Sequence, residues 1–65
     1  MKGFIQVTNR YPTGGERKVL LNVNAIKFIE LEPYDSKGYY TVDLAPGAVY
    51  VSRDDVNRIL AELDK

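Results

Sequence analysis

The stretch "NVNAIKFIELEP", residues 22–33, decides how the rest of the chain can fold. Asn22 and Asn24 interrupt an apolar alternation. Because Asn tolerates left-handed backbone and bonds its own main chain, we expect an irregular turn there. The apolar residues after this turn fall on both faces of one predicted strand: Ile26, Phe28, Ile29 and Leu31. The change of phase between Phe28 and Ile29 predicts a β-bulge or a sharp bend, which would let one strand serve both halves of a strongly curved sheet.

Strand-like segments lie on both sides of this stretch. Polar and apolar residues alternate along them, as expected for strands with one buried face. The predicted strands span about residues 3–8, 17–23, 26–32, 39–44 and 48–51. Gly, Pro, Asn and Asp cluster in the connections, which indicates hairpins and tight turns and therefore a mainly antiparallel sheet.

The segment "VSRDDVNRILAELDK", residues 51–65, predicts a C-terminal helix over about residues 53–63. Ser52 is the expected N-cap, with Asp55 three residues later as in a capping box. One apolar stripe follows the i, i+3, i+4, i+7 spacing: Val56, Ile59, Leu60 and Leu63. A helix of about three turns is marginal alone in water, so we expect this stripe, Leu60 included, to be buried against the sheet.

The predicted fold is one domain over residues 1–65, α+β but mainly β. It is a small five-stranded antiparallel barrel or strongly bent sheet with one C-terminal helix. One sheet face collects most apolar strand residues: Ile5, Val7, Val19, Leu21, Val23, Tyr40, Val42, Leu44, Val49 and Val51. The other face carries Phe4, Leu20 and Phe28 among polar residues.

The helix has two possible positions, and they differ in what happens to Phe4, Leu20 and Phe28. If the helix caps an open end of the barrel, these three residues form an exposed patch for a second copy or another protein. We then expect self-association at high concentration through a twofold-symmetric contact. If the helix lies directly over the three residues, that patch does not exist.

The composition restricts the chemistry. The chain has no Cys and no His, which excludes disulfides and the usual ligands of zinc, haem and iron–sulfur clusters. Without His, neither serine has a recognisable base beside it. Glu30 with Glu32 is explained as a solvated strand edge, and Asp54 with Asp55 as helix-start electrostatics. We therefore predict no enzymatic activity, no catalytic residues, no cofactor and no metal site.

Charge is distributed unevenly, although the formal net charge is zero. Basic residues predominate up to residue 27, and acidic residues predominate from residue 28 onward. Neighbouring strands of opposite sign explain this pattern, and so does a basic hairpin that contacts an acidic partner. A neutral chain lacks the surplus of Lys and Arg that phosphate binding needs, so nucleic acid is not the expected partner.

The candidate partner-binding residues lie in two loops and on the second sheet face. Five tyrosines are many for 65 residues, and Tyr and Arg are enriched in protein interfaces. The candidates are Arg10 and Tyr11 in the first loop, Tyr34, Lys37 and Tyr39 in the second, and Phe4, Leu20 and Phe28 on the sheet. The alternative is that tyrosines fill a curved sheet with their hydroxyls in solvent, and we favour it for Tyr40 and Tyr50.

The order of elements carries a family resemblance. A strand "IQVT", a hairpin, "VLLNVNAIKFIE", a proline, another strand pair and a capped helix follow one another, and the core of the pattern is Leu21 to Glu30. The chain thereby resembles the FlbD family of small flagellar proteins and related short bacterial and phage reading frames. The resemblance implies a flagellar or accessory role and no catalytic residues.

Two other hypotheses remain open beside this one. The strand–turn–"IKFIE" pattern is similar to half of the LytTR DNA-binding domain, which implies a nucleic-acid-binding module. The size also fits a phage-type inhibitor or accessory protein that binds a host factor. Our main prediction is a small protein–protein interaction module whose partner is a protein of unknown identity. The N-terminal "MKGFIQV" is unlike a signal peptide and no apolar run approaches a membrane span, so we expect a cytoplasmic protein.

Overall fold

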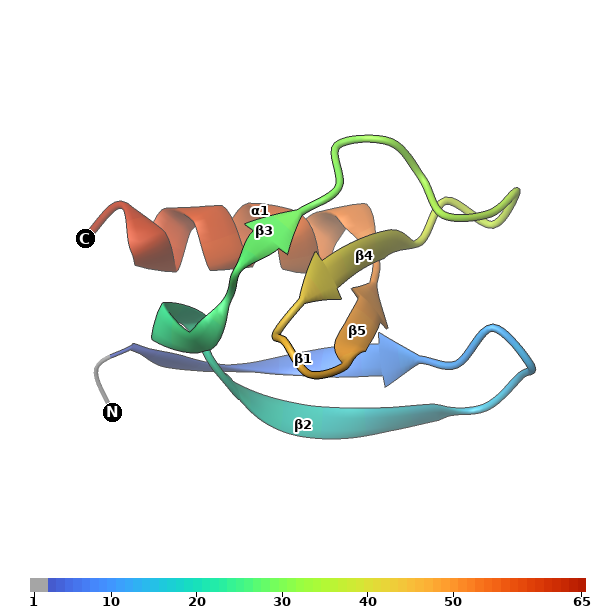
Figure 1. Ribbon diagram of the computed structural model, residues 1–65, viewed down its shortest axis with the longest axis horizontal. Helices are drawn as coiled ribbons and strands as arrows, with labels where there is room; N and C mark the ends of the chain where they lie inside the picture. Colours follow the sequence, from blue (N-terminus) through green and yellow to red (C-terminus); the bar gives the residue numbers. More distant parts are fainter. Residues whose placement is uncertain (1–2) are drawn as a thin grey trace.

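The computed structural model describes residues 3–65, which form two antiparallel sheets and a C-terminal helix (Figure 1). The elements follow in the order β1 (Phe4–Arg10), β2 (Glu16–Asn22), η1 (Val23–Ala25), β3 (Phe28–Ile29), β4 (Tyr40–Asp43), β5 (Ala48–Val51) and α1 (Arg53–Leu63). β1 pairs with β2 in the first sheet, and β3, β4 and β5 are neighbours in that order in the second. The predicted class, mainly β with one C-terminal helix, is confirmed.

β1 and β2 form a regular hairpin with seven paired positions, from Phe4 opposite Asn22 to Arg10 opposite Glu16. The turn closes through a hydrogen bond from the Tyr11 N–H to the Gly15 carbonyl at 3.1 Å. The alternation along the hairpin sends odd-numbered residues such as Val7 into the core. Even-numbered residues lie on its outer face.

The irregular turn predicted at the two asparagines is the short 3₁₀ helix η1. The Asn22 side-chain oxygen accepts the Asn24 N–H at 3.0 Å, and the Val23 N–H reaches back to the Gly3 carbonyl at 2.7 Å. Gly3 has φ +85°, and a Cβ there would lie 2.7 Å from the side-chain nitrogen Nδ2 of Asn24. Only glycine fits this position without strain.

β3 is much shorter than predicted, because the ladder to β4 is disturbed at both ends. Lys27 donates to the Asp43 carbonyl at 2.7 Å although Phe28 faces Asp43 in the register, so two residues oppose one as in a β-bulge. In the same register Glu32 would bond to the Tyr39 carbonyl. That carbonyl instead accepts the Tyr34 N–H, which turns the chain into a loop.

The core lies between the two sheets and the helix. Its buried residues are Val7, Leu21, Val23, Val42, Val49, Val51, Val56 and Ile59, and partly buried Ile5, Val19, Ile26, Ile29, Tyr40 and Leu44 pack against them. Every residue predicted for the apolar sheet face is in this set. The two sheets meet where β5 lies beside β1, and there the Tyr50 N–H donates to the Asn9 side chain at 3.0 Å. No ladder closes the sheets into a barrel within residues 3–65, so a bent two-sheet arrangement takes its place.

α1 begins as predicted, since the Ser52 hydroxyl accepts the Asp55 N–H at 3.3 Å. The prediction that Leu60 and Leu63 are buried is wrong, because 47% and 46% of their surfaces are exposed. Leu63 is the last residue of α1 and borders an open pocket. The buried side of the helix is centred on Ile59, with Asp55 one turn before it and Glu62 one turn after it. Because each residue rotates the helix by about 100°, Leu60 points well away from this centre.

Candidate functional site

Two loops that the sequence marked separately lie at the same end of the molecule (Figure 1). The guanidinium carbon of Arg10, at the end of β1, lies 5.5 Å from the centre of the Tyr39 ring. This is the geometry of a cation–π interaction. Arg10 is also held by Glu16, its ladder partner, at 2.7 Å. The hairpin and the long loop before β4 are therefore joined through a single arginine.

A second aromatic pair lies nearby, because the Tyr34 N–H bonds to the Tyr39 carbonyl and the Tyr50 N–H to the side chain of Asn9, next to Arg10. The Tyr34 and Tyr50 ring centres are 4.7 Å apart, with the rings tilted by 47°. Tyr34 has 53% of its surface exposed, so the pair faces solvent rather than the core. Arg10, Tyr34, Tyr39 and Tyr50 together are called the aromatic surface below.

The sequence favoured sheet filling for Tyr50, which lies half-buried in β5 with its ring against Tyr34. A signal for this existed. Val49 and Val51 were predicted to face the core, so alternation directs Tyr50 outward. Tyr40, in contrast, packs against the core as predicted.

The loop that carries Tyr34 and Tyr39 is organised by Asp35. One carboxylate oxygen of Asp35 accepts the N–H groups of Lys37 and Tyr39, at 3.0 and 3.4 Å. The Asp35 carbonyl accepts the Gly38 N–H at 3.1 Å, and Gly38 has the φ of +82° that this turn requires. These bonds hold the backbone of the loop between Tyr34 and Tyr39 in one conformation.

The other two loop candidates, Tyr11 and Lys37, lie outside the aromatic surface. Tyr11 follows Arg10 in the chain and is exposed, and its carbonyl accepts the Gly14 N–H within the hairpin turn. Lys37 is exposed at the turn of the long loop. Within residues 3–65, neither side chain makes an aromatic or cation–π contact with the aromatic surface.

The three sheet candidates do not share one sheet face, so that prediction is wrong. Phe4 and Leu20 lie on the outer face of the β1–β2 hairpin, where Leu20 is opposite Gln6. Phe28 belongs to β3 in the other sheet. The prediction assumed a single sheet, whereas the strands form two. α1 contacts β1 and η1 and leaves Leu20 and Phe28 exposed.

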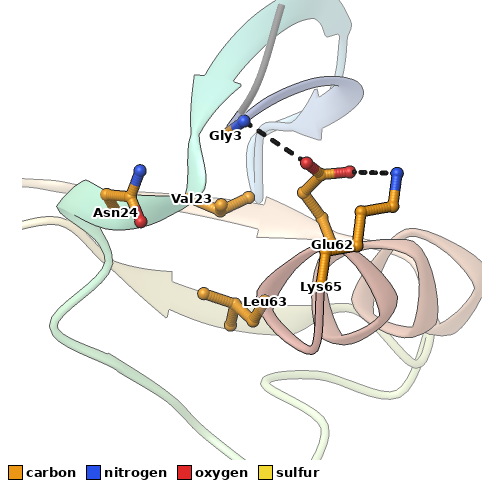
Figure 2. A pocket seen from close by; sticks show the side chains of 6 residues that line it. All are labelled: Gly3, Val23, Asn24, Glu62, Leu63 and Lys65. Carbon is orange, nitrogen blue, oxygen red and sulfur yellow. Dashed lines mark hydrogen bonds and ion pairs between the residues drawn. The ribbon is translucent and has the colours of Figure 1, made fainter.

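A small open pocket of about 100 Å³ lies between the end of α1 and the start of β1 (Figure 2). Its lining residues are Gly3, Val23, Asn24, Glu62, Leu63 and Lys65. The Glu62 carboxylate accepts the Gly3 N–H at 3.3 Å and pairs with the Lys65 Nζ at 3.1 Å. Pockets for drug-sized ligands measure roughly 300–1,000 Å³, so this pocket is too small to be our candidate site. It marks the contact between the end of α1 and the start of the hairpin.

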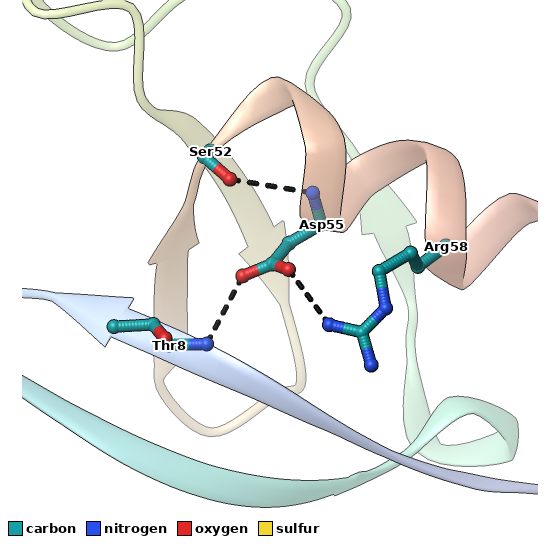
Figure 3. Close-up of polar contacts among 4 residues, drawn as sticks. All are labelled: Thr8, Ser52, Asp55 and Arg58. Carbon is teal, nitrogen blue, oxygen red and sulfur yellow. Dashed lines mark hydrogen bonds and ion pairs between the residues drawn. The ribbon is translucent and has the colours of Figure 1, made fainter.

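Asp55, which is only 8% exposed as a residue, has a structural role (Figure 3). One of its oxygens accepts the Thr8 N–H at 3.0 Å, and the other pairs with Arg58 at 3.0 Å. These contacts fix α1 against β1. Within residues 3–65, no group of three His, Cys, Asp or Glu residues is placed to hold a metal ion. No helix in the same range is long and apolar enough to cross a membrane.

The candidate site is therefore the aromatic surface, which the geometry alone identifies. Its members come from the end of β1, from the loop before β4 and from β5. No family model matches the chain, and no curated protein or solved structure matches it significantly, so the resemblance to the FlbD family stays a prediction.

Proposed function

We propose that this chain is a non-enzymatic protein–protein interaction module that binds its partner through the aromatic surface. The observation that carries the proposal is the contact of Arg10 with Tyr39, which unites two loops into one surface. Tyr34 and Tyr50 extend it with a second pair of rings. Arginine and tyrosine are the residue types that dominate binding energy at protein interfaces.

The composition of this surface suits a protein partner. Tyrosine presents a large apolar ring with a polar hydroxyl and loses few rotamers on binding. Arg10 is already paired with Glu16, so its charge is partly compensated and the surface does not depend on an anionic ligand. The FlbD-like hypothesis gives a flagellar component as the partner, and the phage-type hypothesis gives a host factor. Both use the same surface.

Site-specific photo-crosslinking in cells of the source organism tests the proposal. A photoreactive phenylalanine analogue replaces exposed Tyr34, and the matched control places the same analogue at exposed Ala61 on α1. We expect a defined crosslinked protein from position 34 only. The same product should weaken in an Asp35→Ala background, because the loop loses the carboxylate that organises it. Equal products from both positions, or none from position 34, would contradict the proposal.

The LytTR-like hypothesis makes an opposite prediction that a gel shift tests. A DNA-binding module should retard duplex DNA, with an affinity that falls steeply as salt is added. Because this chain has no net positive charge, we expect no retardation at physiological salt. A salt-sensitive shift at low and physiological salt would replace the protein-binding proposal with the DNA-binding one.

A further inference from the structure

Within residues 3–65, the outer sides of β2 and β3 have no strand beside them, and the residues there carry opposite charges. β2 is the outer strand of the first sheet, and β3 is an outer strand of the second. The exposed residues on β2 are Glu16, Arg17, Lys18 and Leu20, of which Glu16 is paired with Arg10. We call Arg17, Lys18 and Leu20 the basic edge. The exposed residues that begin at β3 are Phe28, Glu30, Leu31 and Glu32, which we call the acidic edge.

The backbone of β2 is available for pairing along the basic edge. The Thr8 N–H points away from β2, because it donates to Asp55 on the helix. Lys18 lies opposite Thr8, so its own N–H and carbonyl also point away from the hairpin. The two-residue period gives Leu20 the same orientation, and 60% of its surface is exposed. An unpaired edge of this kind is a template for strand addition.

The acidic edge follows β3. The Glu30 N–H bonds inward to the Thr41 carbonyl, and beyond it the chain bends out of the ladder at Leu31 and Glu32. Leu31 has 80% of its surface exposed and Phe28 is also exposed, so this edge presents apolar side chains between its charges.

These charges are not compensated within the described molecule. The ion pairs within residues 3–65 join Arg10 to Glu16, Arg58 to Asp55 and Lys65 to Glu62. None of them involves a charge of either edge. β2 and β3 are also in different sheets, so opposite signs on neighbouring strands do not explain the uneven charge distribution.

We propose that the basic edge of one copy binds the acidic edge of a second copy, in a twofold-symmetric dimer that makes this contact twice. Charge complementarity selects the partner, since Arg17 and Lys18 meet Glu30 and Glu32. Exposed Leu20 and Phe28 add buried apolar area to this contact, and the open backbone of β2 is available for main-chain hydrogen bonds. A contact made only once would leave one edge open on each copy and would extend into a chain of molecules.

Charge reversal followed by mixing tests the dimer. One variant, Arg17→Glu/Lys18→Glu, reverses the basic edge, and another, Glu30→Lys/Glu32→Lys, reverses the acidic edge. Every substituted position is exposed, and circular dichroism checks that each variant is folded. Sedimentation equilibrium of the wild type should show a mass that rises from 7.4 kDa to twice that value with concentration and falls with added salt.

Each reversal variant alone should keep the monomer mass, because like charges then face each other at both contacts. An equimolar mixture of the two should return to the dimer mass, since every contact is again between opposite charges. The control Lys37→Glu/Asp64→Lys reverses two exposed charges outside both edges and should dimerise like the wild type. Tyr34→Ser should also dimerise normally, which separates this proposal from the one on the aromatic surface.

Several results would overturn the proposal. A wild type that stays monomeric at every concentration has no such contact, even if the basic edge binds a foreign acidic peptide. A reversal variant that still dimerises places the interface elsewhere. A mixture that stays monomeric would show that the two edges do not bind each other. A mass that grows beyond the dimer would show that the contact does not close into a twofold dimer.

Discussion

The two ends of α1 are held at β1 by the same kind of bond, but they differ in the length of that bond and in what surrounds it. Near the first turn, Asp55 accepts the Thr8 N–H of β1 at 3.0 Å, and in the last turn Glu62 accepts the N–H of Gly3, just before β1, at 3.3 Å. The two carboxylate side chains are equally exposed, at 12% each, but Glu62 borders an open pocket. A shorter hydrogen bond away from open solvent is stronger, so the N-terminal end should hold the helix more firmly.

Both ends depend on Ile59, which lies between them and is fully buried. Ile59→Ala should cost about 2–5 kcal/mol of unfolding free energy, because it removes apolar contacts and leaves a cavity. Leu60→Ala is the matched control and should cost much less, because about half of that side chain already faces water. Urea denaturation of both variants measures the difference. Equal losses would place the buried side of the helix where the apolar stripe alone predicted it.

The Asp55 end should give the next largest effect. Asp55→Ala leaves the Thr8 N–H and the Arg58 side chain without their carboxylate, which should cost about 1–3 kcal/mol. Asp54→Ala removes the same charge from the same turn at an exposed position. It therefore controls for the helix dipole. If the two variants have equal denaturation midpoints, the bond to β1 contributes nothing beyond the charge.

The Leu60 error shows where sequence reasoning ends. The apolar stripe of the helix and its N-cap could be predicted from spacing and residue type, and so could all but one strand. The exact buried side could not, because Asp55 and Glu62 turn inward to accept N–H groups of β1. Those donors come from residues more than forty positions away, and no local pattern indicates them.

The candidate site was predictable to a similar extent. Arg10, Tyr34 and Tyr39 could be selected by residue type and by their place in loops. Their meeting could not be predicted, since it depends on Asp35 ordering one loop and on Glu16 orienting the arginine. The shortened β3 has the same origin, because the Tyr34 N–H takes the Tyr39 carbonyl.

The N-cap residue Ser52 provides a further test of the N-terminal end of α1. Ser52→Ala removes the hydroxyl that accepts the Asp55 N–H and should cost about 1 kcal/mol. Thermal or chemical denaturation measures this loss, and Ser36→Ala in the exposed loop is the control. An unchanged midpoint for Ser52→Ala would mean that the Asp55 carboxylate alone fixes the start of the helix.

The smallest effect is expected at Glu62, and it should depend on pH. The pKa of Glu62 lies below its ordinary value of 4.5, first because the Lys65 side chain hydrogen-bonds the carboxylate and second because the Gly3 N–H does. The unfolded chain therefore binds this proton first as the pH falls. Stabilisation by the ionised carboxylate is fully present above pH 4.5 and is lost as the pH falls through the folded-state pKa.

Glu62→Gln removes this titration and keeps the size of the side chain. The variant should be slightly less stable than the wild type at neutral pH, and the difference should vanish as the pH falls well below 4.5. Because the other carboxylates titrate in both proteins, the difference between their denaturation midpoints isolates Glu62. The gap should also shrink with added salt, since solvent and ions screen this end of the helix. A gap that stays constant across the pH series would mean that Glu62 contributes through packing, and the two ends of α1 would then differ in kind and not only in strength.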